Sequence, residues 1–204
     1  VTSTGTFDQI SISKDNNFLV ARQINKTNGV WELDLATKSV RQIIPTTKDE
    51  LKVEDVTSDN RLLITKTDSK GKDGLWLMNI DGTNEKLLTI YNGENSGPIQ
   101  RAGITNDEKY CYYVSDNEVW RIKLDGSEKE KLTDSPSIAK AFGSIAPDAT
   151  YILFNTVSPY SVQKLDVATK TVTPVLVREG TSFFVMGYAR QQNLIAYTAS
   201  EKTG

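Results

Sequence analysis

Few residue types in this sequence are capable of nucleophilic or acid–base chemistry. The 204 residues include 26 Asp and Glu, a single cysteine and no histidine. Without histidine, the chain can build neither a Ser-His-Asp relay nor a Cys-His relay, and histidine-ligated zinc or haem sites are excluded as well. Cys111 lies in the apolar run YCYYV, which favours a buried structural thiol over a nucleophile.

Paired carboxylates are the remaining route to catalysis, because two of them a short distance apart can act as acid and base. Most Asp and Glu residues, however, stand in turn or surface patterns. The segment DSKGKDG from Asp68 resembles a calcium loop, but Lys70 and Lys72 occupy positions where oxygen ligands are needed. We therefore expect no catalytic residues, no metal site and no cofactor, and no enzyme activity from this chain itself.

An internal repeat accounts for many of the aspartates. The octapeptide LDLATKSV at Leu33 returns almost unchanged as LDVATKTV at Leu165. Two related copies lie between them, LWLMNIDGTNEKLL from Leu75 and VWRIKLDGSEKEKLT from Val119. Self-similarity at a period of about 44 residues is typical of a stacked or radial repeat architecture.

A second anchor precedes each of these copies and contains a turn aspartate. Its four copies read SISKDNNFLV, DVTSDNRLLI, GITNDEKYCYYV and SIAPDATYILF, with the aspartates at Asp15, Asp59, Asp107 and Asp148. A fifth copy, GYARQQNLIAYTA, has Gln191 in the place of the aspartate. An Asx side chain can accept a hydrogen bond from the backbone two residues further on, so these aspartates are interpreted as turn residues.

The elements that carry these turns are short strands. The first repeat has apolar, β-branched runs at 7–13, 18–24, 30–35 and 39–44, and no run shows a helical period. Four strands in about 44 residues is the unit of a propeller. We therefore predict an all-β fold, a β-propeller of four-stranded antiparallel blades that is apparently partial. Tryptophan recurs in the third strand, at Trp31, Trp76 and Trp120, where it is expected to pack between neighbouring sheets.

The predicted domain organisation is a single β-propeller segment over residues 1–204. Its blades are expected at about 7–45, 52–90, 99–133 and 138–178, followed by an incomplete blade at 183–204. Two strands without further partners leave an open apolar edge, which sheets normally avoid. We expect this edge of the fifth blade to be paired with a strand from a partner or from remaining blades of the same protein.

Two stretches carry a resemblance to a known family. GSIAPDATYILFNT from Gly143 and VWELDLATKSVRQII from Val30 resemble the propeller repeat of TolB-like proteins, and the repeat is WD-repeat-like in its blade pattern. The other anchors depart from the family pattern, with Lys14, Ser58 and Asn106 in place of its proline. The resemblance implies a propeller fold, a role in recognition, and an extracytoplasmic setting that is periplasmic, cell-surface or secreted.

The loops that join blades and the loops between second and third strands are expected at one end of each sheet, here called the loop end. These loops vary while the strands repeat, and variable loops on a rigid scaffold commonly carry recognition. Aromatic residues and arginine dominate interface hot spots. The candidate partner-binding residues are therefore Tyr91, Arg101, Tyr160 and Arg178.

These observations favour a non-catalytic β-propeller scaffold for protein–protein or ligand recognition within a larger extracytoplasmic protein. The net charge is −2 and no basic block stands out, so no nucleic-acid partner is expected. No apolar window reaches the length of a membrane span, so we expect no membrane insertion by this segment. The alternative is the substrate-gating propeller of a hydrolase resembling the prolyl oligopeptidase family, whose catalytic domain would lie outside this sequence.

Overall fold

Antiparallel strands make up the fold. The structure is a computed structural model that describes residues 6–13, 17–25, 27–47, 51–67, 73–91, 99–134, 139–157, 160–179, 181–189 and 194–201. Over these residues the regular elements are eighteen strands, and none is a helix. The chain divides into two compact units, residues 1–92 and 93–204, and each is described by itself.

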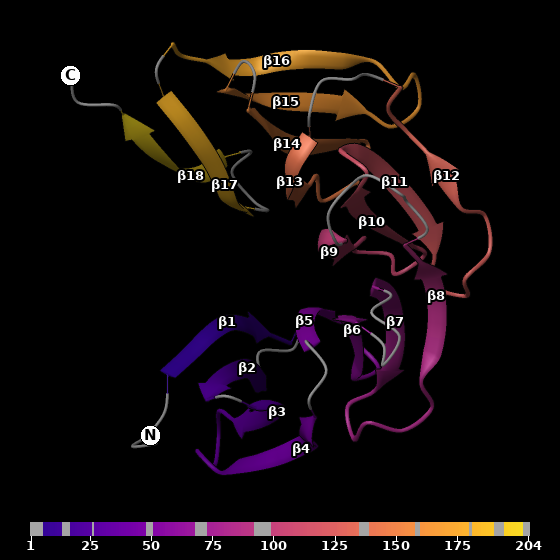
Figure 1. Ribbon diagram of the computed structural model, residues 1–204, viewed down its shortest axis with the longest axis vertical. Coiled ribbons are helices and arrows are strands. Elements are labelled where there is room, and N and C mark those ends of the chain that lie inside the picture. The colour runs from indigo at the N-terminus through magenta and orange to yellow at the C-terminus, as the bar shows by residue number, and fades with distance from the viewer. Residues whose placement is uncertain are drawn as a thin grey trace. The chain divides into compact units, whose positions relative to one another are not determined.

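The first unit contains two four-stranded sheets, in which strands that follow one another in sequence are neighbours (Figure 1). One sheet consists of β1 (Thr6–Ile12), β2 (Phe18–Asn25), β3 (Thr27–Asp34) and β4 (Val40–Thr47). The other consists of β5 (Leu51–Val56), β6 (Arg61–Thr67), β7 (Asp73–Asn79) and β8 (Lys86–Ile90). Strand β1 packs against β5, so the first strands of the two sheets lie side by side.

The second unit contains two further four-stranded sheets and a two-stranded one. Its third sheet consists of β9 (Gln100–Ile104), β10 (Tyr110–Ser115), β11 (Glu118–Lys123) and β12 (Glu130–Lys131). The fourth consists of β13 (Ala139–Ile145), β14 (Tyr151–Val157), β15 (Tyr160–Asp166) and β16 (Val172–Val177). The fifth pairs β17 (Thr181–Ala189) with β18 (Leu194–Glu201). Strand β13 packs against both β9 and β17.

Within each unit, apolar side chains fill the space between consecutive sheets. In the first unit, Val30 and Ile44 of the first sheet form one cluster with Leu62 and Ile64 of the second. In the second unit, residues of the third and fourth sheets share another cluster, as do Leu153 and Phe183 of the fourth and fifth. Burial of such side chains is the dominant favourable contribution to folding, so each sheet depends on its neighbour for stability.

The turns between strands use the residues that their geometry requires. Gly82 and Gly126, each after an aspartate, have φ values of 81° and 80°, a left-handed conformation that glycine adopts without strain. At the equivalent turns of the first and fourth sheets, Lys38 and Lys170 have φ values of 60° and 58°. Asn60, in the turn before β6, is left-handed as well, as expected from the tolerance of asparagine for this region.

The recurring tryptophans are less buried than the sequence predicted. Trp76 packs against the cluster between the first two sheets, yet Trp31, Trp76 and Trp120 are all only half-buried. Lysine side chains lie over two of these rings, and the Nζ of Lys66 is 4.6 Å from the Trp76 ring centroid. The Nζ of Lys129 lies 5.0 Å from the Trp120 ring centroid. Each of these two rings therefore contacts a cation in addition to apolar neighbours.

Candidate functional site

The repeated aspartates hold the turns of the scaffold. Asp81 Oδ1 accepts hydrogen bonds from the backbone N–H of Thr83 at 2.9 Å and from its hydroxyl at 2.6 Å. Asp125 makes the same pair of contacts with Ser127, at 2.8 Å and 2.5 Å. Asp148 makes them with Thr150, at 3.1 Å and 2.8 Å. Asp107 likewise accepts from the Lys109 N–H at 3.2 Å, so the interpretation of Asp107 and Asp148 as turn residues is confirmed, whereas Asp15 lies outside the described residues.

Hydrogen bonding also changes the acidity of these groups. The side-chain hydroxyl of Thr83 is the largest cause lowering the pKa of Asp81 below its ordinary value, and Thr150 does the same for the pKa of Asp148. At Asp166 the largest cause of the lowered pKa is the backbone N–H of Thr169. The carboxylates are therefore held in their charged form, which suits a structural acceptor and not a general acid near neutral pH.

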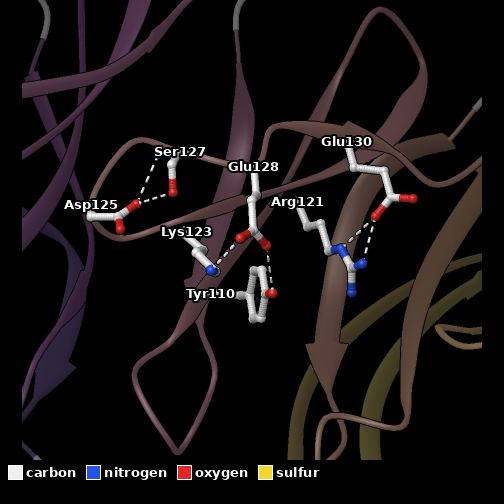
Figure 2. Close-up of polar contacts among 7 residues, drawn as sticks. All are labelled: Tyr110, Arg121, Lys123, Asp125, Ser127, Glu128 and Glu130. Carbon is white, nitrogen blue, oxygen red and sulfur yellow. Dashed lines mark hydrogen bonds and ion pairs between the residues drawn. The ribbon is translucent and has the colours of Figure 1, made fainter.

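A network of charged side chains lies on the third sheet, on β10, β11 and β12 and the turn before β12 (Figure 2). The Tyr110 hydroxyl donates to Glu128 at 3.1 Å, and Glu128 also pairs with Lys123. Arg121 Nε donates to Glu130 at 2.7 Å. The Arg121 guanidinium also lies over the Tyr110 ring, 5.0 Å from its centroid, so the two halves of the network meet at these two side chains.

This network extends to the fourth sheet. Lys170 Nζ, in the turn before β16, forms an ion pair with Glu130 at 2.7 Å. The Asn106 side-chain amide donates to the Pro147 carbonyl at 2.8 Å, which joins a turn of the third sheet to a turn of the fourth. These contacts connect neighbouring sheets, and the charged groups in them are paired with one another. We therefore interpret them as structural.

The structure brings two of the four predicted binding residues together. Tyr160 begins β15 and Arg178 follows β16, and the adjacent residues Ser161 and Val177 are directly paired. Tyr160 is 43% exposed, and Arg178 is exposed as well. The backbone carbonyl of Arg178 accepts a hydrogen bond from the Thr181 N–H at 3.3 Å, which connects this segment to the start of β17. Both residues therefore lie at the loop end of the fourth sheet.

Val177 is a neighbour that the sequence analysis did not single out. It is 57% exposed, although it belongs to the strand VTPVLV. Leu176 beside it packs against the cluster shared with the fifth sheet, so apolar residues lie on both faces of β16. The run Val175, Leu176, Val177 was a signal for this exposure, because continuous apolar residues on an outer strand leave one face uncovered. Tyr160, Val177 and Arg178 are called the loop-end patch below.

The other two predicted residues are placed separately. Arg101 is exposed in β9, where it is the extra residue of a β-bulge between Gln100 and Ala102. Its φ of 45° is unusual for a residue with a side chain. Tyr91, in the first unit, is half-buried after β8, and its N–H donates to the Asp73 carbonyl at 2.8 Å. Arg101 is therefore a candidate for recognition, whereas the backbone of Tyr91 also serves to close its sheet.

Glu118 is an acidic residue with a perturbed pKa that the sequence did not single out. It begins β11, at the loop end of the third sheet, and accepts a hydrogen bond from the Thr133 hydroxyl. Burial is the largest influence on this carboxyl and raises its pKa above the ordinary value. Thr133 Oγ1 also accepts from the Val119 N–H at 3.0 Å, so Glu118 belongs to a closed set of hydrogen bonds.

Much of the loop end lies outside the described residues. The undescribed residues at this end include 48–50, 68–72, 92–98, 135–138 and 158–159, and Lys70 and Lys72 of the calcium-like segment are among them. Over the described ranges, no group of three or more Asp, Glu or Cys side chains is arranged to hold a metal ion. No helix in the described part of the chain has the length and apolar character needed to cross a membrane.

The comparisons with known proteins identify the fold. The sequence matches no protein-family model, and no curated protein is similar to it in sequence. TolB from Acinetobacter baumannii is similar in structure, with a TM-score of 0.73 and 18% identity, over 98% of this chain and 53% of that one. A putative TolB from Agrobacterium tumefaciens has a TM-score of 0.68 and 17% identity, over 89% of this chain and 65% of that one.

An oligogalacturonate lyase in complex with manganese is also similar, with a TM-score of 0.65 and 12% identity, over 98% of this chain and 66% of that chain. The present chain thus spans between about half and two thirds of the length of these proteins. All three are β-propeller proteins. The prediction of an all-β, TolB-like propeller repeat fold is confirmed.

Proposed function

We propose that this chain is a non-catalytic β-propeller segment that recognises a protein partner through the loop-end patch of its fourth sheet. The observation that carries the proposal is the position of Tyr160, Val177 and Arg178 at one end of the β15–β16 pair. An exposed aromatic side chain, an exposed aliphatic one and an arginine in one place have the composition of an interface hot spot. Arg101, at the bulge in β9, is a further contact candidate.

The chemistry of the described residues supports binding over catalysis. The turn aspartates and the ionic network of the third sheet are engaged in holding turns and neighbouring sheets. Glu118, whose pKa is raised by burial, is hydrogen bonded to Thr133. We propose accordingly that any catalytic activity of a larger protein would reside in other segments, and that this segment supplies recognition.

We further propose an extracytoplasmic setting, periplasmic, cell-surface or secreted. The support is the similarity of fold to two TolB structures, which remains a similarity between proteins of less than 20% sequence identity. Expression of the chain with and without an export signal, followed by measurement of folded yield in each compartment, tests this part. If the chain expressed without the export signal reached the same folded yield and bound its partner as well as the exported chain, the proposal would be contradicted.

The binding proposal is tested by affinity capture with matched variants. The double variant Tyr160→Ala/Arg178→Ala removes the aromatic and charged members of the loop-end patch. Lys86→Ala, on an exposed position of β8, removes one charge from the other unit and serves as the control. A partner retained by the wild type and by Lys86→Ala, but lost about tenfold or more by the double variant, is the expected result. Equal retention by all three proteins would refute the proposed surface.

A further inference from the structure

Arg101 combines an unusual backbone conformation with an exposed side chain. It lies inside β9, as the extra residue of the bulge between Gln100 and Ala102, and its φ is 45°. All other described non-glycine residues with positive φ lie in connections between strands. A left-handed extra residue is the bulge geometry in which glycine normally takes this place. Arginine is therefore strained where glycine would not be, and such outliers cluster at functional sites.

The bulge also accounts for the direction of the side chain. An extra residue interrupts the alternation of a strand and redirects the side chain that it carries. The residues that follow, Ala102, Gly103 and Ile104, are all buried, whereas Arg101 is exposed. The guanidinium group is therefore presented to solvent at the start of β9, at the loop end of the third sheet.

This guanidinium group is not paired within the described part of the chain. Three other arginines, Arg41, Arg61 and Arg121, each form an ion pair with a carboxylate of this chain. Arg101 forms neither an ion pair nor a side-chain hydrogen bond with any described residue. A guanidinium group presents a planar fork of N–H donors that matches a carboxylate in a bidentate arrangement. Arg101 therefore has the chemistry of a carboxylate receptor whose ligand comes from another molecule.

We infer that Arg101 binds a carboxylate of the protein partner, so that the partner presents an aspartate or glutamate side chain to the third sheet. The inference rests on the proposed recognition function and names the chemistry of one contact. A single arginine favours a carboxylate over a phosphate group, because one guanidinium group can engage both carboxylate oxygens, whereas phosphate sites commonly combine several donors. Binding also gives a reason for keeping arginine at a strained position that suits glycine.

An NMR titration of the ¹⁵N-labelled chain with a hexaglutamate peptide tests the inference. The Nε–H signal of Arg101, assigned by its loss in Arg101→Gln, should shift with hexaglutamate and stay in place with hexaglutamine. Arg101→Gln removes the charge and should raise the dissociation constant for hexaglutamate about tenfold or more. Arg41→Gln is the matched control, because Arg41 is exposed but already pairs with Glu32, and it should bind as the wild type does.

The variant Arg101→Gly separates a binding role from a structural one. Glycine adopts positive φ without strain, and this relief offsets the greater conformational freedom of glycine in the unfolded chain. The variant should therefore lose hexaglutamate affinity as Arg101→Gln does, yet melt at the wild-type temperature or above it. A clearly lower melting temperature would overturn the inference, because the arginine side chain would then be supporting the fold.

The titration itself can also contradict the inference. An Arg101 signal that hexaglutamate does not shift would overturn it, as would equal affinity in Arg101→Gln and the wild type. A shift with tripolyphosphate and none with hexaglutamate would overturn the assignment to a carboxylate. The peptide titration uses no residue of the loop-end patch, and partner capture through Tyr160 and Arg178 is measured separately. Failure of this contact and failure of the proposed function are therefore distinguishable.

Discussion

At the scale of single residues, the aspartates of this chain act as acceptors in turns. A carboxylate oxygen at the start of a tight turn can accept from a backbone N–H and a hydroxyl two residues later, as Asp81 does with Thr83. In the first sheet, Asp34 Oδ1 accepts hydrogen bonds from the backbone N–H groups of both Ala36 and Thr37. These hydrogen bonds stabilise the charged form of the carboxyl group. The repeated aspartates therefore have a structural role in the turns.

Acid should therefore destabilise the fold through these turns. Hydrogen bonds lower the folded-state pKa of Asp81, Asp148 and Asp166 below the unfolded value, so the folded protein binds fewer protons than the unfolded chain in this range. The associated stability is fully present above about pH 5 and is lost as pH falls through the folded-state pKa values. Melting temperatures measured from pH 6 to pH 2.5 should decrease with acid. In Asp81→Asn the decrease should be smaller, and an unchanged wild-type melting temperature would contradict the prediction.

Trp76 offers a second test at this scale. Trp76→Ala removes a large side chain from the edge of the cluster between the first two sheets and should cost about 3 kcal/mol, the lower end of the range for such changes, because the ring is only half-buried. Trp76→Phe is the matched control. The indole Nε1 is buried with no hydrogen-bond partner among the described residues, so phenylalanine removes an unsatisfied donor and should cost clearly less. Urea unfolding of both variants measures the difference, and equal losses would argue against this packing.

At the scale of elements, neighbouring sheets within each unit share apolar clusters, and polar contacts also join the third sheet to the fourth. Arg121 and Glu130 join β11 to β12 within the third sheet, and Lys170 extends the contact to the fourth. Burial alone would lower the pKa of Arg121, but hydrogen bonding with Tyr112 and the charge of Glu130 raise it overall. The guanidinium therefore remains charged and paired.

A double-mutant cycle measures the strength of this bridge. The side chains of Arg121 and Glu130 are about 27% and 33% exposed, so solvent screens their attraction and a coupling of about 0.5 to 1 kcal/mol is expected from Arg121→Ala and Glu130→Ala. The pair Arg41–Glu32, within the first sheet, provides the comparison, and its coupling should be smaller because Arg41 is 64% exposed. A larger coupling for the first-sheet pair would show that exposure does not govern these bridges.

The sequence predicted the elements well because strand patterns and turn residues are local. The expected strands at 7–13 and 18–24 begin within one residue of the observed starts of β1 and β2. The division of residues 1–204 into one domain and its blades stays a prediction. The position of Tyr160 near the end of β16 depends on the register that pairs Ser161 with Val177, which no local pattern specifies. The bulge at Arg101 and the partial exposure of the tryptophans depend on tertiary packing in the same way.

At the scale of the whole molecule, the chain repeats a structural unit and varies it at the loop end. The repeats use their carboxylates for turns, and the residues that distinguish one sheet from the next include Tyr160, Val177 and Arg178. Under the proposed function, specificity resides in these exposed positions.

Purified chain should accordingly show no turnover of esterase, peptidase or glycosidase substrates. The physical reason is that the carboxylates of the described turns are held charged by hydrogen bonds, and the sequence contains no histidine to act as a base near neutral pH. Assays with chromogenic substrates, repeated after a second purification, check this. Activity that persists and then disappears in Glu118→Gln would identify that residue as catalytic and contradict the prediction.

Site-specific photocrosslinking tests the recognition surface most directly. A photoreactive amino acid in place of Tyr160 reports on contacts at the loop end of the fourth sheet, and the same group at Ala168, in the exposed turn at the opposite end of that sheet, is the control. The prediction is one discrete protein adduct from position 160, absent from position 168 and abolished by Arg178→Glu. Adducts of equal yield from both positions, or an adduct from position 168 alone, would contradict recognition through the loop-end patch.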